Sequence, residues 1–271
     1  MPYGYLSKRL LTFFEENSPP EVTLLKKLIT LSLLGSLAFT NIVVAETPIN
    51  LNFDLGMTIS QLSKNTTVTP TNGLTKSYTA DTSPQYAPFI GVGAEYVFDS
   101  FTAMPIAMGL GLSAYYVGLG KLSGTEVPGS NLGLTDTLNY SMDASSAVIM
   151  FEPRLIYTAH PLQPYVIAGA GYAWNTLSNF AESTPSDGNA AASNPYGSHT
   201  EHHVSYELGL GAQYALRTPE TSNLTFHVEY RFIYLGDAQL GAADGQSTSE
   251  RLSSRTLSTH IIDCGLGYKF Q

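Results

Sequence analysis

Residues 203–216 read HVSYELGLGAQYAL. Every second residue, beginning with Val204 and ending with Leu216, is apolar or aromatic, and the residues between them are mostly small or polar. A period of two residues indicates a β-strand, because successive side chains of a strand point to opposite faces. The segment is much longer than the usual strand of about five or six residues. It therefore predicts one long strand with an apolar face and a polar face.

The same alternation recurs along the chain, so we predict eight strands. They cover residues 50–62, 85–98, 105–117, 147–158, 164–176, 203–216, 224–235 and 257–270. The segments between them are alternately long (63–84, 118–142, 177–202 and 236–256) and short (99–104, 159–163 and 217–223). Short turns at one rim and long loops at the other are typical of membrane barrels. The predicted fold is all-β, an eight-stranded antiparallel transmembrane up-and-down β-barrel over residues 46–271. Only the strand at 147–158 is irregular, because Val148 and Met150 fall on its polar face.

Two features indicate that the apolar faces meet lipid. The opposite faces carry glycine and charged residues, which suit the narrow, side-chain-filled interior of an eight-stranded barrel but not the dry core of a soluble sandwich. Aromatic residues gather at both ends of the apolar faces, as in the girdles of membrane barrels. The predicted periplasmic girdle is Tyr96, Phe98, Tyr157, Tyr214, Phe226, Tyr268 and Phe270, and the outer girdle is Tyr86, Tyr116, Trp174, Tyr206 and Tyr234.

The composition narrows the class of function. Charged residues make up 13% of the 271 residues, about half the share of an ordinary soluble domain. The net charge of −9 argues against a nucleic-acid partner. The single cysteine, Cys264, excludes an internal disulfide. Alternation places it on the lipid face, where a thiol behaves as a small apolar residue.

Residues 24–45 have the parts of a cleaved signal peptide. Lys26 and Lys27 precede an apolar run that is shorter than the ~20 residues of a membrane-spanning helix. Small residues follow, and we predict cleavage after Ala45. Residues 1–23 are unusual, because they place several glutamates ahead of the basic region. We interpret them as lying upstream of the true translation start; the alternative is a long signal with an amphipathic leader.

Three segments resemble a known family. They are residues 164–172 (PYVIAGAGY), 228–237 (VEYRFIYLGD) and 265–270 (GLGYKF). They are similar to the small eight-stranded outer-membrane β-barrel proteins, which include the OmpA-type membrane domain and opacity-like surface proteins. The resemblance covers residues 46–271 and implies an integral protein of the outer membrane of a Gram-negative bacterium, exported by its signal peptide. Tyr268 and Phe270 resemble the terminal signal read by the family's barrel assembly machinery, although Gln271 follows Phe270.

Alternation directs nine charged side chains into the barrel. They are Asp54, Glu95, Glu152, Arg154, Glu207, Glu229, Arg231, Asp263 and Lys269. Charges confined to so narrow a space are expected to pair. We therefore predict a structural ion-pair network that fills the lumen. The alternative is a narrow cation-preferring channel, because six carboxylates face three bases.

No other group of residues predicts a catalytic, cofactor or metal site. His199, Glu201, His202 and His203 form a cluster of the kind that can bind zinc, but nothing fixes a ligand geometry. A lipid A hydrolase would need a Ser/His pair with an orienting carboxylate. His203 and Ser205 face the lumen, and Ser258 and His260 face outward without an evident carboxylate. The paired glycines are not followed by a helix, as a dinucleotide site requires.

We therefore expect a monomeric barrel without enzymatic activity or cofactor. Its expected role is structural or surface-exposed, namely envelope integrity, adhesion or host contact through four long extracellular loops. The channel is the second interpretation and the lipid A hydrolase the third. The expected partners are outer-membrane lipid and lipopolysaccharide, the barrel assembly machinery, and a host or surface ligand of the loops.

Overall fold

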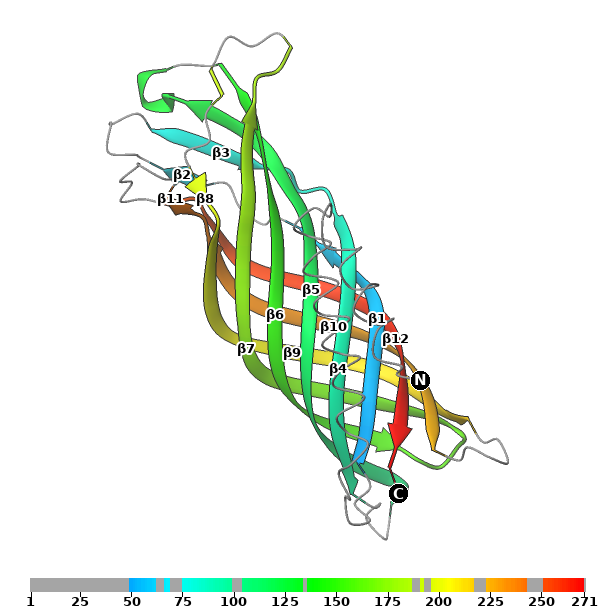
Figure 1. The fold of residues 1–271 in the computed structure, drawn as a ribbon. Coiled ribbons are helices and arrows are strands. Elements are labelled where there is room, and N and C mark those ends of the chain that lie inside the picture. The colour runs from blue at the N-terminus through cyan, green and yellow to red at the C-terminus, as the bar shows by residue number, and fades with distance from the viewer. Residues whose placement is uncertain are drawn as a thin grey trace, which may run out of the picture. The chain divides into compact units, whose positions relative to one another are not determined.

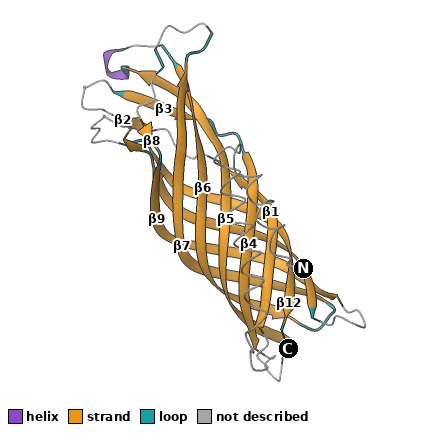
Figure 2. Cartoon of the chain, viewed as in Figure 1, coloured by secondary structure: helices purple, strands orange, loops and turns teal. Residues whose placement is uncertain are grey.

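The computed structural model describes residues 49–61, 66–68, 75–98, 104–133, 136–186, 191–192, 196–216, 223–242 and 251–270. The predicted leader, signal peptide and cleavage after Ala45 lie outside these residues. The described part of the chain is almost entirely β-structure (Figure 2), with one short 3-10 helix, η2 (Ser130–Leu132). Within it, no helix is long and apolar enough to cross a membrane.

Eight long strands of the described chain close into a ring (Figure 1). They are β1 (Ile49–Ser60), β4 (Gln85–Phe98), β5 (Ile106–Pro128), β6 (Leu138–Tyr157), β7 (Leu162–Ser183), β9 (His199–Leu216), β10 (Leu224–Gln239) and β12 (Ser253–Lys269). Each is antiparallel to the next, and β1 also pairs with β12 from Asn50↔Lys269 to Ser60↔Thr259. The predicted eight-stranded antiparallel barrel is confirmed.

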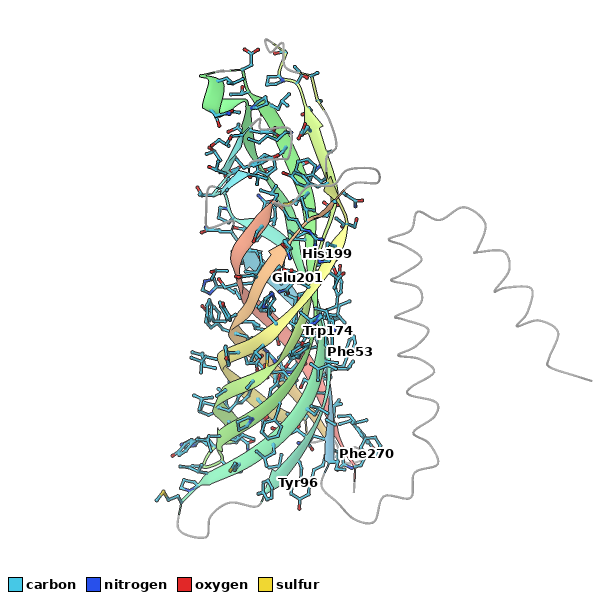
Figure 3. The ribbon with its side chains drawn as sticks, turned by 90° about the vertical axis from the view of Figure 1, so that its left-hand side faces the viewer. Phe53, Tyr96, Trp174, His199, Glu201 and Phe270 are labelled. Atoms are coloured by element: carbon cyan, nitrogen blue, oxygen red, sulfur yellow. The ribbon has the colours of Figure 1, made fainter. Side chains whose placement is uncertain are left out.

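The predicted alternation of faces is also confirmed. On β9, Leu208 and Leu210 are 66% and 59% exposed on the outer wall, whereas Ser205 and Glu207 between the outward residues are buried. Both aromatic girdles lie on the outer wall. Figure 3 shows Tyr96 and Phe270 at the end where the chain's last strand finishes, and Trp174 nearer the opposite end. The two girdles therefore lie at the two ends of the apolar band on the outer wall.

The predicted long loops are partly wrong, because four strand pairs continue far past the predicted membrane-spanning segments. β5 runs to Pro128 instead of residue 117, and β6 begins at Leu138 instead of residue 147. β7 continues to Ser183, and smaller extensions lengthen β9, β10 and β12. The Ser, Thr and Gly content suggested loops there, but these residues pair in register from Gly120↔Ala144 to Glu126↔Leu138.

Short strands complete this extension. We call it the extracellular extension, after the orientation predicted from the loop lengths, and define it as the described parts of residues 66–80, 119–145, 177–197 and 235–257. β2 (Thr66–Val68) pairs with β3 (Lys76–Ala80), and β3 pairs with the outer part of β5. β8 (Tyr196–Gly197) pairs with β11 (Gly241–Ala242) in a second, two-stranded sheet. In Figure 1 these elements gather at the end of the barrel opposite the C-terminus.

Bulges mark the places where strands leave the membrane cylinder. The register of β5 shifts between Gly118 and Gly120, and that of β10 shifts around Gly236. Gly120 and Gly236 have φ of 81° and 84°, a left-handed conformation that glycine adopts without steric cost. Buried side chains hydrogen-bond the backbone carbonyls near these bulges. Thr58 Oγ1 donates to the Gly118 carbonyl at 2.6 Å, and Asn175 Nδ2 donates to the Leu235 carbonyl at 2.8 Å.

Candidate functional site

A buried arginine organises the charges inside the barrel. Arg231 of β10 is 1% exposed. Its guanidinium contacts five carboxylates: Glu229, Asp263 (Nε to Oδ2, 3.2 Å), Glu152 (3.5 Å), Glu207 (3.7 Å) and Asp54 (3.8 Å). These acids come from β1, β6, β9, β10 and β12. One cation therefore contacts carboxylates on five of the eight strands of the ring.

A second arginine extends this network toward the periplasmic end. Arg154 of β6 lies 3.4 Å from Glu95 and 3.1 Å from Glu229, and its guanidinium stacks on the Tyr165 ring at 4.4 Å. Tyr165 in turn donates a hydrogen bond to Glu229. Glu229 thus bridges the two arginines. Six carboxylates and two guanidiniums, all from the predicted set, form one connected lumen network.

Lys269 is the exception among the predicted lumen charges. It is exposed, and none of the described acidic side chains lies within ion-pair distance of it. It lines a cavity of about 340 Å³ at the periplasmic mouth, together with Asn50 and Thr225. The prediction that it joins the network is wrong, because alternation gives the face of a residue but not its depth, and this one lies at the end of the last strand.

His227 belongs to the network, although the sequence prediction did not include it. Its Nε2 lies 2.6 Å from Asp54 Oδ1. Both residues are paired in register with Gly265, which lies between them on β12. A Cβ on Gly265 would collide with both side-chain atoms, so glycine is required for the contact. The alternation of β10 had directed His227 inward, and this was the signal that could have found it.

Apolar residues close the interior directly above the lumen network. Phe89 and Tyr115 cover the guanidinium of Arg231, with its Cζ 5.9 and 5.1 Å from the two ring centroids. Val148, Met150, Ala173, Ile233 and Ile261 fill the same layer and are at most 2% exposed. Val148 and Met150, which seemed irregular in the sequence, therefore do point inward. The charged side chains of the membrane-spanning interior lie in its periplasmic half, whereas the layer above combines apolar side chains with buried hydroxyl and amide groups such as those of Thr58, Asn175 and Ser205.

The apolar interior continues without a break into the extracellular extension. Tyr78, Tyr140, Phe180 and Tyr196 come from four different strands and are all buried. Their rings meet edge-on or stacked, with centroid distances from 5.0 Å (Phe180 to Tyr196) to 6.4 Å (Tyr78 to Tyr196). Such aromatic pairs stabilise by about 0.5–1.5 kcal/mol beyond their buried area. The extension is therefore a packed part of the fold with its own core.

A second buried charge cluster lies in this extension. Lys76 Nζ of β3 is 2.8 Å from Glu126 of β5 and 3.1 Å from Glu182 of β7. One lysine thus holds two carboxylates. Burial, helped by the hydrogen bond from Glu182, raises the pKa of Glu126 to about 7 against the opposing effect of Lys76. The nearby Tyr140 has its pKa raised to about 12, chiefly by burial.

The remaining sequence candidates do not converge on a catalytic or zinc site. The Ser205 hydroxyl donates its hydrogen bond to the Tyr234 carbonyl at 2.6 Å and not to His203. His260 Nδ1 is bound to Tyr230 at 2.6 Å on the outer wall. Glu201 accepts from Gln239 and lies 3.8 Å from His203. His202 instead stacks outside on Tyr172, and His199 Nε2 contacts Arg251 at 3.4 Å. Figure 3 shows His199 and Glu201 beyond Trp174, toward the extension.

The predicted assembly signal lies on the outer wall at the end of β12. Tyr268 and Phe270 are 45% and 38% exposed, and their rings contact edge-on at 4.9 Å. The Phe270 amide donates to the Ile49 carbonyl at 3.0 Å, which ties the end of the chain to the first strand. Both rings are therefore displayed together at the seam where the barrel closes.

The sequence pattern of one protein family matches nearly the whole barrel. The family is described as the outer membrane protein beta-barrel domain, and it matches residues 55–270. The chain belongs to this family, and with it to the β-barrel proteins of the Gram-negative outer membrane. The predicted relation to small outer-membrane barrels is confirmed.

Several solved structures are similar to this chain. Neisserial surface protein A (NspA) is 12% identical, with a TM-score of 0.42, over 82% of this chain and 97% of NspA. Ail of Yersinia pestis, solved with the heparin analogue sucrose octasulfate, is 10% identical (TM-score 0.33, 82% and 99% covered). The outer membrane protease OmpT from Escherichia coli is 8% identical (TM-score 0.33, 84% and 99% covered). A search of curated protein sequences gives no match.

The first prediction concerns Arg231. Replacing it with methionine (Arg231→Met) leaves five buried carboxylates without their shared cation, and we expect the free energy of unfolding to fall by about 3–5 kcal/mol. Trp174 is the single tryptophan and lies on the outer wall, so its fluorescence can follow urea unfolding in lipid vesicles. Arg251→Met removes an exposed arginine and is the control. Equal unfolding midpoints for the two variants would contradict a stabilising role of the network.

The second prediction concerns pH. Because the pKa of Glu126 is about 7 in the folded extension and about 4.5 in an unfolded chain, the folded state binds more protons between these values. The contribution of Glu126 to the stability of the extension is therefore fully present below about pH 4.5 and is lost as the pH rises toward 7. Hydrogen exchange of the β5 and β6 amides, corrected for intrinsic rates, is expected to be slower at pH 5 than at pH 8. Glu126→Gln is expected to remove this difference; a wild-type difference that survives in the variant would assign it to another group.

Proposed function

We propose that the protein is a closed, monomeric scaffold of the outer membrane that holds a folded β-sheet extension at the cell surface. The observation that carries this proposal is the continuous filling of the interior. The lumen network fills the periplasmic half, and the apolar layer with Val148 and Met150 fills the next part. Above it, the aromatic core of the extension includes Tyr78 and Phe180. A barrel filled in this way supports strands that continue past the membrane.

The surface role that this arrangement supports is contact, through adhesion, host contact or envelope integrity. β5, β6 and β7 present a three-stranded sheet with polar outer faces, to which β3 and β2 add. Outward residues such as Lys121, Thr125 and Asn139 are exposed there. A rigid sheet loses little conformational entropy when a partner binds, which favours binding. Neither the sequence candidates nor the lumen residues offer a nucleophile, base and orienting group in contact, so we propose no catalysis.

The cation-preferring channel is the alternative, and conductance separates it from the scaffold. The apolar layer is made of fully buried side chains such as Met150, Ile233 and Ile261, so we expect purified wild-type protein to leave planar lipid bilayers silent. Insertion is verified separately by reconstitution into vesicles and protease protection, so that silence reflects a closed barrel. Reproducible stepwise openings would favour the channel and would refute the closed interior.

Shortening the extension tests the contact role without touching the membrane part. Lys121 and Asp143 pair directly across β5 and β6. Replacing residues 122–142 by the two-residue turn Asn-Gly therefore joins strands that are already paired. We expect cells displaying this variant to lose most of the surface adhesion that wild-type protein confers. Heat-modifiable gel migration is expected to persist, because the ring below Gly118 is intact. Full adhesion by the shortened variant would place the contact surface elsewhere.

A further inference from the structure

Three metal-binding side chains converge inside the barrel on neighbouring strands. Asp54 on β1 and His227 on β10 approach each other over Gly265 of β12. Asp263 lies two residues before Gly265 and therefore points to the same inward face. One oxygen from each aspartate and one ring nitrogen of His227 all lie within 4.8 Å of one another. All three residues are at most 3% exposed.

Asp263 supplies an unused ligand atom to this group. Neither of its oxygens has a hydrogen-bond partner in the described residues, although Oδ2 lies 3.2 Å from Arg231 Nε. Arg231 also approaches Asp54 through Oδ2, at 3.8 Å. Both aspartates thus contact the guanidinium through Oδ2, and Asp54 Oδ1 contacts His227 Nε2 instead. A buried carboxylate oxygen without a partner is costly, and a bound cation removes that cost.

The charge balance of the lumen network points the same way. Six buried carboxylates surround two guanidiniums, and Glu207 also lacks hydrogen-bond partners for both oxygens in the described chain. Even with His227 protonated, the carboxylates are in excess by three. An excess of this size in a confined, buried space calls for protons or a further cation.

We propose that Asp54, His227 and Asp263 bind one divalent transition-metal ion, for which Zn²⁺ is the best match. An imidazole nitrogen with two carboxylate oxygens is a ligand set that Zn²⁺ accepts, with water completing the coordination. The imidazole disfavours Ca²⁺ and Mg²⁺, which prefer all-oxygen sites. To coordinate, His227 Nε2 exchanges its hydrogen bond with Asp54 for the metal, and the two groups remain side by side.

The route to the site runs from the periplasm. The cavity at the periplasmic mouth is lined by Thr225, which is two residues before His227 on the same inward face of β10, and by Asn50, which is four residues before Asp54 on β1. In the opposite direction the lumen network is covered by the apolar layer, which includes Met150, Ile233 and Ile261. The ion therefore enters and leaves on the side of the membrane away from the extension, which makes this site separate from the surface role.

Zinc binding to the purified barrel tests this proposal. Protein in detergent micelles is stripped with a chelator at pH 7.5 and titrated with Zn²⁺ alone, by calorimetry or by competition with a chromophoric chelator. We expect one saturable site per chain. Removing even an outer-shell partner of a metal ligand typically weakens binding by about 10–100-fold. Asp263→Asn and His227→Gln remove the proposed ligands themselves, so each is expected to weaken Zn²⁺ binding at least tenfold. Zn²⁺ is also expected to raise the temperature at which heat-modifiable migration is lost in the wild-type protein but not in Asp263→Asn or His227→Gln.

Two controls make the result specific. Glu95→Gln removes a lumen carboxylate that contacts Arg154 and is outside the trio, and His203→Gln removes a partly exposed imidazole. Both are expected to bind Zn²⁺ like the wild type. The proposal is overturned if wild-type protein shows no saturable site, if the trio variants bind normally, or if Glu95→Gln weakens binding as strongly as they do. Heat-modifiable migration shows whether each variant is folded. If Asp263→Asn or His227→Gln does not fold, Asp54→Asn is tested in its place.

Discussion

The fold depends on one constraint, which is that hydrocarbon cannot hydrogen-bond a peptide group. The ladder between β1 and β12 meets this constraint by joining the first and last strands of the ring over most of their length. Once the ring is closed, alternation divides every strand into an outer and an inner face. Leu208 and Phe53 lie on the outer face, which meets lipid, and their sequence neighbours Glu207 and Asp54 must share a narrow interior.

The narrow interior then decides what the protein is able to do. Its strands carry glycines such as Gly265, which lets Asp54 and His227 on the two flanking strands reach one another. Arg231 occupies the boundary, with carboxylates on one side and the rings of Phe89 and Tyr115 on the other. A cation is stable at that position because it gains both ion pairs and aromatic faces. The charged and apolar parts of the interior thus contact each other through Arg231.

The sequence predicts the ring, its faces and most of its inner charges, because all three follow from a period of two. It does not predict depth along the barrel, and Lys269 was therefore assigned to the network although it lies at the mouth. It also does not predict which distant residues meet. His227 and Asp54 are separated by 173 positions and Lys76 and Glu182 by 106, and only the strand register brings them together. Composition misled the prediction outside the membrane, where paired strands rich in Ser, Thr and Gly resemble loops.

β6 explains that error and shows how it can be avoided. Its alternation is unbroken from Leu138 to Tyr157, but the polarity of its two faces inverts along the way. In the membrane half, Phe151 faces out and Glu152 faces in; in the outer half, Asp143 faces out and Met142 faces in. The outer face changes from apolar to polar because its surroundings change from lipid to water. The inner face changes from charged to apolar because it leaves the lumen network and joins the apolar core. The segment near Val148, where both faces are apolar, marks the transition. A strand that seems irregular at one end is therefore a sign that the barrel wall continues beyond the membrane.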